Sequence, residues 1–201
     1  MTAVTAAAVR RPDGRAERSR RTRAAVVDAL LALQDEGELA PSVQRVADRA
    51  GISARTLYLH FRDLEALFVE VGERFLLTLG GIGDPVPLDG PLPERVEAFC
   101  RRRALVLERL LPVFRSARIR QPFSAALQSN RDRYVAAADE ETDVIFEPEL
   151  GAMAPERRAT VRSALHLATC AAGWDVLRDD RRLDFAAATD VLRCSVLGLL
   201  S

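Results

Sequence analysis

Residues 42–61 read SVQRVADRAGISARTLYLHF, and this stretch decides the fold of the 201-residue chain. Gly51 permits the positive φ that a tight reversal requires, and Ser53 follows as an N-cap whose hydroxyl can satisfy a free backbone amide. Leu57 and Phe61 lie four residues apart and point inward from a second short helix. The first short helix has an apolar face at Val43, Val46 and Ala47. The stretch therefore predicts two short helices joined by a hinge at Ala50-Gly51.

The second short helix leaves four side chains on its outer faces: Arg55, Thr56, Tyr58 and His60. Arg55 is a cation, and the other three are hydrogen-bond donors without a fixed negative charge. Such a face suits a phosphate-lined groove, so the pair of helices is interpreted as a DNA-reading helix-turn-helix.

The same residues resemble the tetracycline-repressor (TetR) family of bacterial transcriptional regulators. The family pattern is T-x-x-x-I-A-x-x-A-G-V-S, then T-L-Y-x-H-F and a Lys that opens the next helix. The resemblance covers roughly residues 18–68, about a quarter of the chain. The matching residues are Ser42, Val46, Ala47, Ala50, Gly51, Ile52, Ser53, Thr56, Leu57, Tyr58, His60 and Phe61.

This resemblance implies roles for particular side chains. Ser42, Tyr58 and His60 are expected to hold phosphates, and Thr56 is expected to meet base edges. Arg55 sits where many members have a small residue; because it lies on an outer face, it is also expected to meet base edges, with Gln44 beside it. One departure stands out, since Leu64 occupies the position of the Lys that touches phosphate in the family. That contact is then missing or supplied by Arg62. The complete set of expected DNA-contacting residues is Ser42, Gln44, Ser53, Arg55, Thr56, Tyr58, His60 and Arg62.

Charge is distributed unevenly although the formal net charge is zero. Residues 1–62 hold 11 Arg against 7 Asp plus Glu, a net +4, and residues 63–201 hold 18 against 22, a net −4. Seven Arg lie between Arg10 and Arg23, against only Asp13 and Glu17. This cluster is expected to steer the N-terminal part toward phosphates, with a merely solvated arm as the alternative.

Composition also favours some classes of protein over others. The three Cys have no C-x-x-C spacing, so a disulfide framework or a structural zinc site is not expected, and a reducing cytoplasm is the expected compartment. The chain begins MTAVTAAAVRR, the reverse of a secretory signal, and no run approaches 18 apolar residues, so no membrane contact is expected.

Apolar periodicity predicts an all-α protein with three parts: a disordered Arg-containing arm at 1–16, a helix-turn-helix domain at 17–62 and a helical ligand-binding and dimerisation domain at 63–201. The four Gly and four Pro of residues 80–93 predict an irregular segment. Besides the two hinged helices, helices are expected at about 17–36, 63–79, 93–111, 112–118, 121–146, 155–179 and 184–200.

Small side chains recur on the last two predicted helices, where they permit close helix approach. In the TetR family the two C-terminal helices of each subunit form a four-helix dimer interface, so the resemblance implies a homodimer. Ordinary packing within one Ala-rich subunit is the alternative. The small residues are Ala168, Ala171, Ala172 and Gly173 on one helix, and Ala187, Ala188, Val191, Ser195 and Gly198 on the other.

The second domain is rich in large apolar residues that line a ligand cavity or simply form the core. The family senses small, often hydrophobic molecules in such a bundle, so the resemblance implies an effector that is largely apolar. The candidates for ligand contact are Phe99, Phe114, Phe123, Tyr134, His166, Cys170 and Trp174. His166 and Cys170 supply only two of the ligands that a metal needs, so neither a metal nor a cofactor is expected.

The sequence thus predicts a homodimeric transcriptional regulator, a repressor that binds a palindromic double-stranded DNA operator and releases it when an effector binds. No nucleophile with a base, paired-carboxylate cleft or cofactor loop is apparent, so an enzyme is not expected. Two alternatives remain: a helical ligand-binding or interaction module with weakened DNA binding, which Leu64 favours, and an all-helical enzyme.

Overall fold

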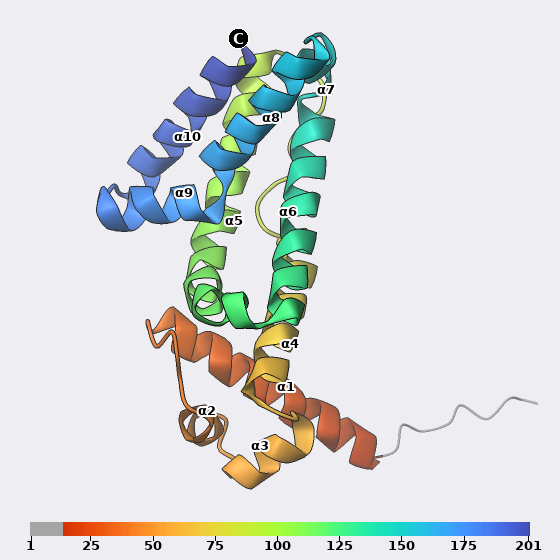
Figure 1. Ribbon diagram of the computed structural model, residues 1–201, viewed down its shortest axis with the longest axis vertical. Helices are drawn as coiled ribbons and strands as arrows, with labels where there is room; N and C mark the ends of the chain where they lie inside the picture. Colours follow the sequence, from red (N-terminus) through yellow and green to blue (C-terminus); the bar gives the residue numbers. More distant parts are fainter. Residues whose placement is uncertain (1–13) are drawn as a thin grey trace, which may run out of the picture.

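The computed structural model describes residues 14–201, which contain α-helices, a 3-10 turn and a π-helical turn but no strand, and the all-α prediction is confirmed. Figure 1 shows a small N-terminal group of helices below a taller bundle. In chain order the elements are α1 (Gly14–Asp35), α2 (Val43–Arg49), α3 (Ala54–His60), α4 (Leu64–Leu79), α5 (Leu92–Arg120), η1 (Gln121–Phe123), α6 (Ala125–Ile145), α7 (Glu147–Gly151), α8 (Pro155–Thr169), α9 (Ala171–Asp175), η2 (Val176–Asp180) and α10 (Phe185–Leu200).

The hinge between α2 and α3 forms as its residue types require. Gly51 has φ +69, a conformation that an L side chain rarely adopts, and Ser53 Oγ accepts a hydrogen bond from the Thr56 amide. Ser42 caps α2 in the same way through the Arg45 amide. Behind the hinge, α1 packs its apolar face on both short helices. Their shared core is fully buried and consists of Val26, Val27, Leu30, Leu33, Val46, Ala47, Leu57 and Phe61.

The start of α1 differs from the predicted boundary, because the helix begins at Gly14 rather than at residue 17 or 18. Residues 14–16 of the predicted disordered arm are therefore helical, and the remainder of that arm lies outside the described residues. The helix extends over Arg15 to Arg23, where Glu17 pairs with Arg20 and Arg21 at i+3 and i+4. Such pairs add a few tenths of a kcal/mol each to a helix, about 0.2–0.5 kcal/mol.

Helix α4 joins the small group of helices to the bundle. Asp63 caps its first turn by accepting from the Ala66 amide, and its buried face contacts α1, α5 and α6. The chain is irregular between the end of α4 and the start of α5 at Leu92, as the Gly and Pro content predicts.

Two predicted helix boundaries in the bundle are wrong. Helix α5 continues through Pro112 to Arg120, although a proline removes one backbone hydrogen bond from a helix interior. Leu110, Leu111 and Val113 beside it are buried in the core, and this packing holds the helix through the defect.

The second error is the predicted continuous helix over residues 155–179, which the structure breaks at Cys170. That residue is extended, with φ −86 and ψ 162, and its Sγ accepts from the Gly173 amide at 3.4 Å. A Cβ at Gly173 would lie 2.9 Å from the Leu167 carbonyl oxygen, so only glycine fits this turn. Figure 1 shows α9 running across the direction of α8.

Tertiary contacts explain the break. The Trp174 side chain is fully buried against α5, and its Nε1 donates to Glu108 Oε2 at 2.8 Å. Arg178 donates to the same Glu108 carboxylate at 2.9 Å and 3.0 Å. A straight α8 would carry Trp174 away from these partners. Within residues 14–201, no helix is both long and apolar enough to cross a membrane.

Candidate nucleic-acid interface and ligand cavity

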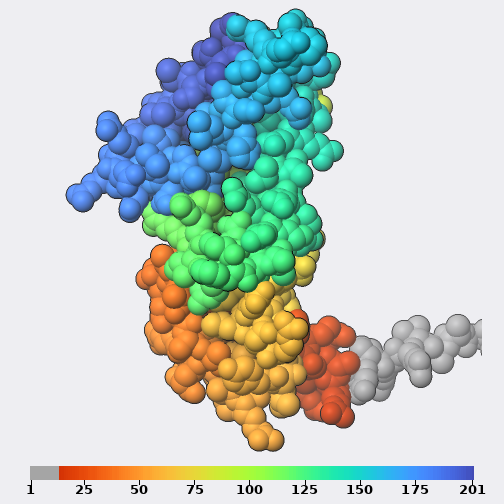
Figure 2. All heavy atoms as spheres, in the orientation of Figure 1, coloured from red at the N-terminus to blue at the C-terminus, as the bar shows by residue number. Residues whose placement is uncertain are grey.

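The outer face of α3 is exposed and lies at the end of the molecule farthest from α10 (Figures 1 and 2). Tyr58 is 53% exposed and Leu59 77%, while Leu57 on the opposite face is fully buried. Arg55 is exposed, and no hydrogen bond or ion pair joins it to another residue of the described chain. Thr56 is half-buried, with Oγ1 2.9 Å from Ser53 Oγ. The α3 face therefore offers a free guanidinium and a free phenol hydroxyl to a partner.

Ser42 and Ser53 use one acceptor site each for helix capping, at 3.2 Å and 3.1 Å from the capped amides. A hydroxyl that accepts a backbone N–H keeps its own proton. Both residues are exposed, so Ser42 can still donate to a phosphate oxygen while it caps α2.

Two of the polar residues beside α3 are paired with acids on the same surface. Gln44 Nε2 donates to Asp48 Oδ1 at 2.7 Å, and Arg62 Nε donates to Asp63 Oδ2 at 2.7 Å. The pKa of Asp63 is lowered by the Ala66 amide and then by Arg62. Arg62 is highly exposed but shares its charge with a carboxylate, which makes it an incomplete substitute for a free lysine.

The imidazole of His60 is half-buried, and its Nδ1 lies 3.5 Å from Ser19 Oγ of α1. Arg23 belongs to the arginine cluster that the sequence predicts to steer toward phosphates. In the structure its side chain instead contacts other parts of the N-terminal domain. Its guanidinium donates to the His60 carbonyl, pairs with Glu70 of α4 and lies 4.3 Å from the centroid of the Phe61 ring. Arg10 and Arg11 of that cluster lie outside the described residues.

Leu64, in the place of the family's lysine, is half-buried and packs against the core at the start of α4. Replacing Leu64 with lysine is expected to raise DNA affinity about three- to tenfold near physiological salt and to steepen the salt dependence by about one counterion. Fluorescence anisotropy titrations at several salt concentrations measure both quantities, with Leu64→Met as the uncharged control. An unchanged salt slope for Leu64→Lys would mean that this position lies off the phosphate backbone.

The bundle contains two adjoining cavities. The first measures about 90 Å³ and lies where α1, α4, α5 and α6 meet; the second measures about 280 Å³ and lies between α5, α6 and α8. Phe114, Gln121, Arg131 and Tyr134 line both, so the two spaces share a wall. The first is mostly apolar, while charged and polar residues including Arg103, Asp139 and His166 line the second.

The predicted ligand-contacting residues separate into two groups. Phe114 and Tyr134 line both cavities, and His166 and Cys170 line the second. Phe99, Phe123 and Trp174 line neither: Phe99 packs edge-on against Phe146 at 5.1 Å, Trp174 is core, and Phe123 is 88% exposed. Periodicity identifies large apolar residues but cannot separate core from cavity wall.

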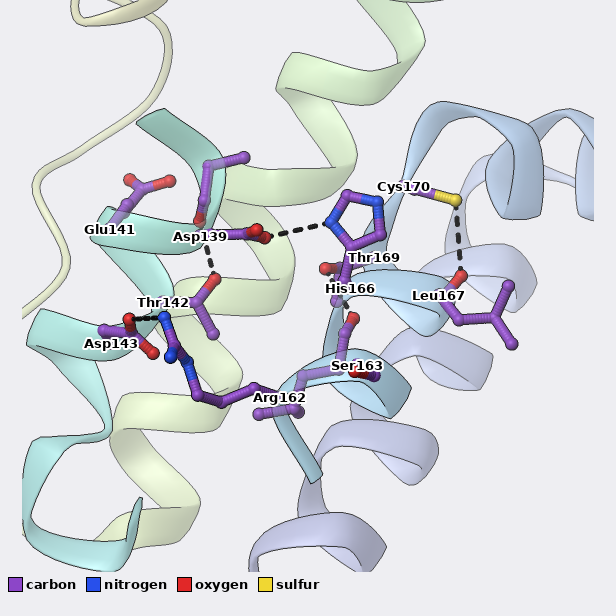
Figure 3. Close-up of polar contacts among 12 residues, drawn as sticks. Asp139, Glu141, Thr142, Asp143, Arg162, Ser163, His166, Leu167, Thr169 and Cys170 are labelled. Carbon is purple, nitrogen blue, oxygen red and sulfur yellow. Dashed lines mark hydrogen bonds and ion pairs between the residues drawn. The ribbon is translucent and has the colours of Figure 1, made fainter. Parts of the chain in front are cut away.

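Hydrogen bonds and ion pairs connect the charged side chains around the second cavity. His166 Nδ1 and Asp139 Oδ1 are 2.9 Å apart, and Figure 3 shows this pair joining α8 to α6 above the Arg162–Asp143 pair. Arg103 is 4% exposed and donates to Glu141 Oε2 at 2.7 Å. Burial lowers the pKa of Arg103 and raises the pKa of Tyr134, whose shift the nearby guanidinium opposes. In the described chain, no three His, Cys, Asp or Glu side chains lie together as a metal site would require.

Sequence reasoning missed Gln34, Asn130 and Arg103 as cavity residues. Gln34 and Asn130 line the first cavity, and Arg103 lines the second. A signal was present for Gln34, since a glutamine continues the apolar stripe of the first helix, where a hydrophobic residue is expected. Asn130 gave no such signal because polar residues surround it in the sequence, and Arg103 gave none because it is the last of three consecutive arginines.

Hydrogen bonds connect the bundle to the helix-turn-helix near these cavities. The Leu39 carbonyl, in the loop between α1 and α2, accepts from Ser116 Oγ at 2.6 Å and from Arg120 at 3.4 Å. Ser124, which caps α6, donates to Glu65 Oε1 of α4 at 2.6 Å. Hydrogen bonds thus connect α5 to the loop before α2 and the start of α6 to α4, on both sides of the helix-turn-helix.

Residues 28–71 match the model of the family described as bacterial regulatory proteins, tetR family. This part of the chain is a TetR-type N-terminal domain. The match covers the end of α1, the whole helix-turn-helix and half of α4, and it supports a general role as a DNA-binding regulator. No curated protein matches the chain.

Solved structures extend the similarity to the whole TetR-family fold. A proposed TetR-family transcriptional regulator from Mesorhizobium loti MAFF303099 is 20% identical, with a TM-score of 0.67 and coverage of 91% of this chain and 96% of that one. A TetR-family transcriptional regulator from Streptomyces coelicolor is 19% identical, with a TM-score of 0.69 and coverage of 90% and 82%. A transcriptional regulator from Rhodococcus sp. RHA1 is 20% identical, with a TM-score of 0.63 and coverage of 90% and 95%. At these identities the similarity establishes the fold.

Proposed function

We propose that this protein is a homodimeric repressor that binds a palindromic operator through α3 and releases it when a small molecule enters the bundle. The observation that carries the DNA-binding part is the exposed α3 face, where Arg55 has no hydrogen-bond or ion-pair partner among residues 14–201 and Tyr58 is 53% exposed. Arg55 and Thr56 meet base edges, and Gln44 joins them once it leaves Asp48. Ser42, Tyr58 and His60 hold phosphates.

Dimerisation is part of the proposal because one α3 reads only about one half-site. A two-fold dimer presents two recognition helices about 34–36 Å apart, one turn of B-DNA, and so binds a palindrome. Helices α8 and α10 pack together and leave Leu167 and Val191 exposed, at 70% and 39%. We assign the subunit contact to this pair of helices. The cytoplasm is the compartment that this function requires.

Release follows from thermodynamic linkage. An effector that binds more tightly when the two recognition helices are splayed weakens operator binding by its difference in affinity for the two states. The hydrogen bonds of Ser116, Arg120 and Ser124 to the N-terminal helices supply a physical connection for this coupling.

The test of the α3 face compares two substitutions on an operator selected from random duplexes. Arg55→Ala is expected to lose about 1–3 kcal/mol of discrimination at one base position, because it removes a base contact. Tyr58→Phe is expected to weaken binding to all sequences equally, because it removes only a phosphate donor. Anisotropy titrations against the operator and its single-base variants measure both effects.

Unchanged operator preference in Arg55→Ala would remove that residue from base reading. Failure of the wild-type protein to show saturable, salt-sensitive binding to any duplex would instead favour a ligand-binding or interaction module with weakened DNA binding. Leu64 and the Arg62–Asp63 pair are the observations that favour this second candidate.

A further inference from the structure

The side chain of Gln34 is the most unusual polar group in the described chain. It is 1% exposed, on the last turns of α1, and neither its Nε2 nor its Oε1 has a hydrogen-bond partner. A buried amide with both ends unpaired costs free energy, since it loses its hydrogen bonds to water and gains none. Such a group in a folded protein requires an explanation.

Gln34 lines the first cavity, whose other walls are mainly the apolar side chains of Phe68, Val71, Phe75, Leu110 and Phe114. The other buried amide in the wall, Asn130, is already satisfied: its Nδ2 donates to the Val69 carbonyl at 3.0 Å, and its Oδ1 accepts from Arg133. Tyr134, between the two cavities, has a buried hydroxyl that faces the Arg103 guanidinium. Among the described residues, Gln34 is therefore the amide of this wall whose nitrogen and oxygen both lack a partner.

A single ordered water does not fill this space. A buried water makes about three hydrogen bonds, and most of this wall is apolar, with Gln34, Gln121 and Arg131 among its few polar side chains. The volume of about 90 Å³ far exceeds the roughly 10–15 Å³ that one water occupies, and it adjoins the larger second cavity. A molecule with an apolar body and one polar group matches both the wall and the amide.

We propose that Gln34 binds the polar group of a small effector, which is a neutral, ring-sized apolar molecule carrying a carboxamide or a similar group that both donates and accepts. The Gln34 carbonyl accepts from the ligand N–H while its amide nitrogen donates to the ligand carbonyl, so both unpaired atoms are satisfied. A neutral group fits because Gln34 is uncharged and Arg131, the cation in this wall, is exposed.

This assignment rests on the proposed release of the operator by an effector, and it connects the bound effector directly to the N-terminal domain. Gln34 belongs to α1, which packs on α2 and α3, and the Leu39 loop held by Ser116 and Arg120 follows it by five residues. A ligand hydrogen-bonded to Gln34 touches the DNA-binding domain itself. The position of α1 then depends on the ligand, and operator binding and ligand binding become reciprocally coupled.

The test uses three probes with the same ring: benzamide, toluene and benzoate. Calorimetric or ligand-observed NMR titrations of the full-length protein give their affinities for the wild type and for Gln34→Leu, which has nearly the same size. The ratio of benzamide to toluene affinity is expected to fall about tenfold in Gln34→Leu, because one hydrogen-bonded pair is lost only for the amide. Benzoate is expected to bind more weakly than benzamide.

Gln128→Leu is the matched control, since Gln128 is exposed on α6 and lines neither cavity. This variant is expected to have the same ratio of benzamide to toluene affinity as the wild type. Gln34→Met provides a second, unbranched replacement, and circular dichroism melting verifies that each variant is folded. Because the apolar variants remove an unpaired buried amide, their melting temperatures in the absence of probe are expected to be no lower than that of the wild type.

Three results would overturn the assignment: a ratio unchanged in both folded Gln34 variants, no binding of any probe to the folded wild type, or a preference for benzoate that the variants retain. Operator binding is measured separately by anisotropy with saturating benzamide. If benzamide binding depends on Gln34 while operator affinity stays constant, the ligand site stands and the release mechanism is wrong.

Discussion

Replacing Glu149 with leucine is expected to lower the free energy of unfolding by about 3–5 kcal/mol, because it leaves the buried Arg95 guanidinium without its counter-ion. Arg95 is 4% exposed and pairs with Glu149 of α7, whose side chain is 16% exposed. The same guanidinium donates to the Ile145 carbonyl at 2.6 Å and to the Gly90 carbonyl at 3.2 Å. Chemical denaturation measures the change.

A double-mutant cycle identifies the cause. Arg95→Met together with Glu149→Leu removes both charges, so the double variant is expected to recover most of the lost stability. The exposed pair Arg133–Glu73, with side chains 55% and 52% exposed, is the control. Glu73→Leu is expected to change stability by less than about 1 kcal/mol. A Glu149→Leu variant as stable as this control would show that the pair is effectively solvated.

Replacing Leu167 with aspartate is expected to convert the protein to a monomer and to weaken operator binding about 100-fold or more. The proposed dimer contact uses α8 and α10, where Leu167 is 70% exposed in the single subunit. A buried carboxylate at the contact is costly when unpaired, and loss of the second half-site removes the gain from bivalent binding, which is about 10²–10⁴-fold.

Light scattering after size-exclusion chromatography measures the oligomeric state, and anisotropy at one fixed salt concentration measures operator affinity. Leu77→Asp serves as the control, because Leu77 is 87% exposed on α4 and lies outside the proposed contact. It is expected to remain dimeric and to bind as the wild type does. A Leu167→Asp protein that stays dimeric would move the contact to another surface.

Some of the small residues noted in the sequence are used within the subunit. Ala171 is 4% exposed and Ala188 is fully buried, and Gly173 is required by the turn at Cys170. Small size at these positions follows from packing against the same chain. Ala172 and Gly198 remain exposed and available to a partner. Spacing alone cannot distinguish the two uses, because both require the same close approach of backbones.

The sequence by itself determined the local structure of the DNA-reading domain. The turn at Gly51, the serine caps and the inward spacing of Leu57 and Phe61 each depend on residues only a few positions apart. A short stretch of sequence is therefore enough to predict them. The outward position of Tyr58 follows from the same helical spacing.

Tertiary structure alone decided the features that depend on distant partners. Trp174, held by Glu108 of α5, bends the chain at Cys170, and packing around Pro112 keeps α5 intact. Arg23 leaves the phosphate-facing cluster because Glu70 and Phe61 lie beside it. The cavity lined by Gln34 is built from residues of four helices that lie far apart in the sequence, α1, α4, α5 and α6. Such features arise from contacts whose energies depend on residues far apart in sequence, and no local pattern encodes them.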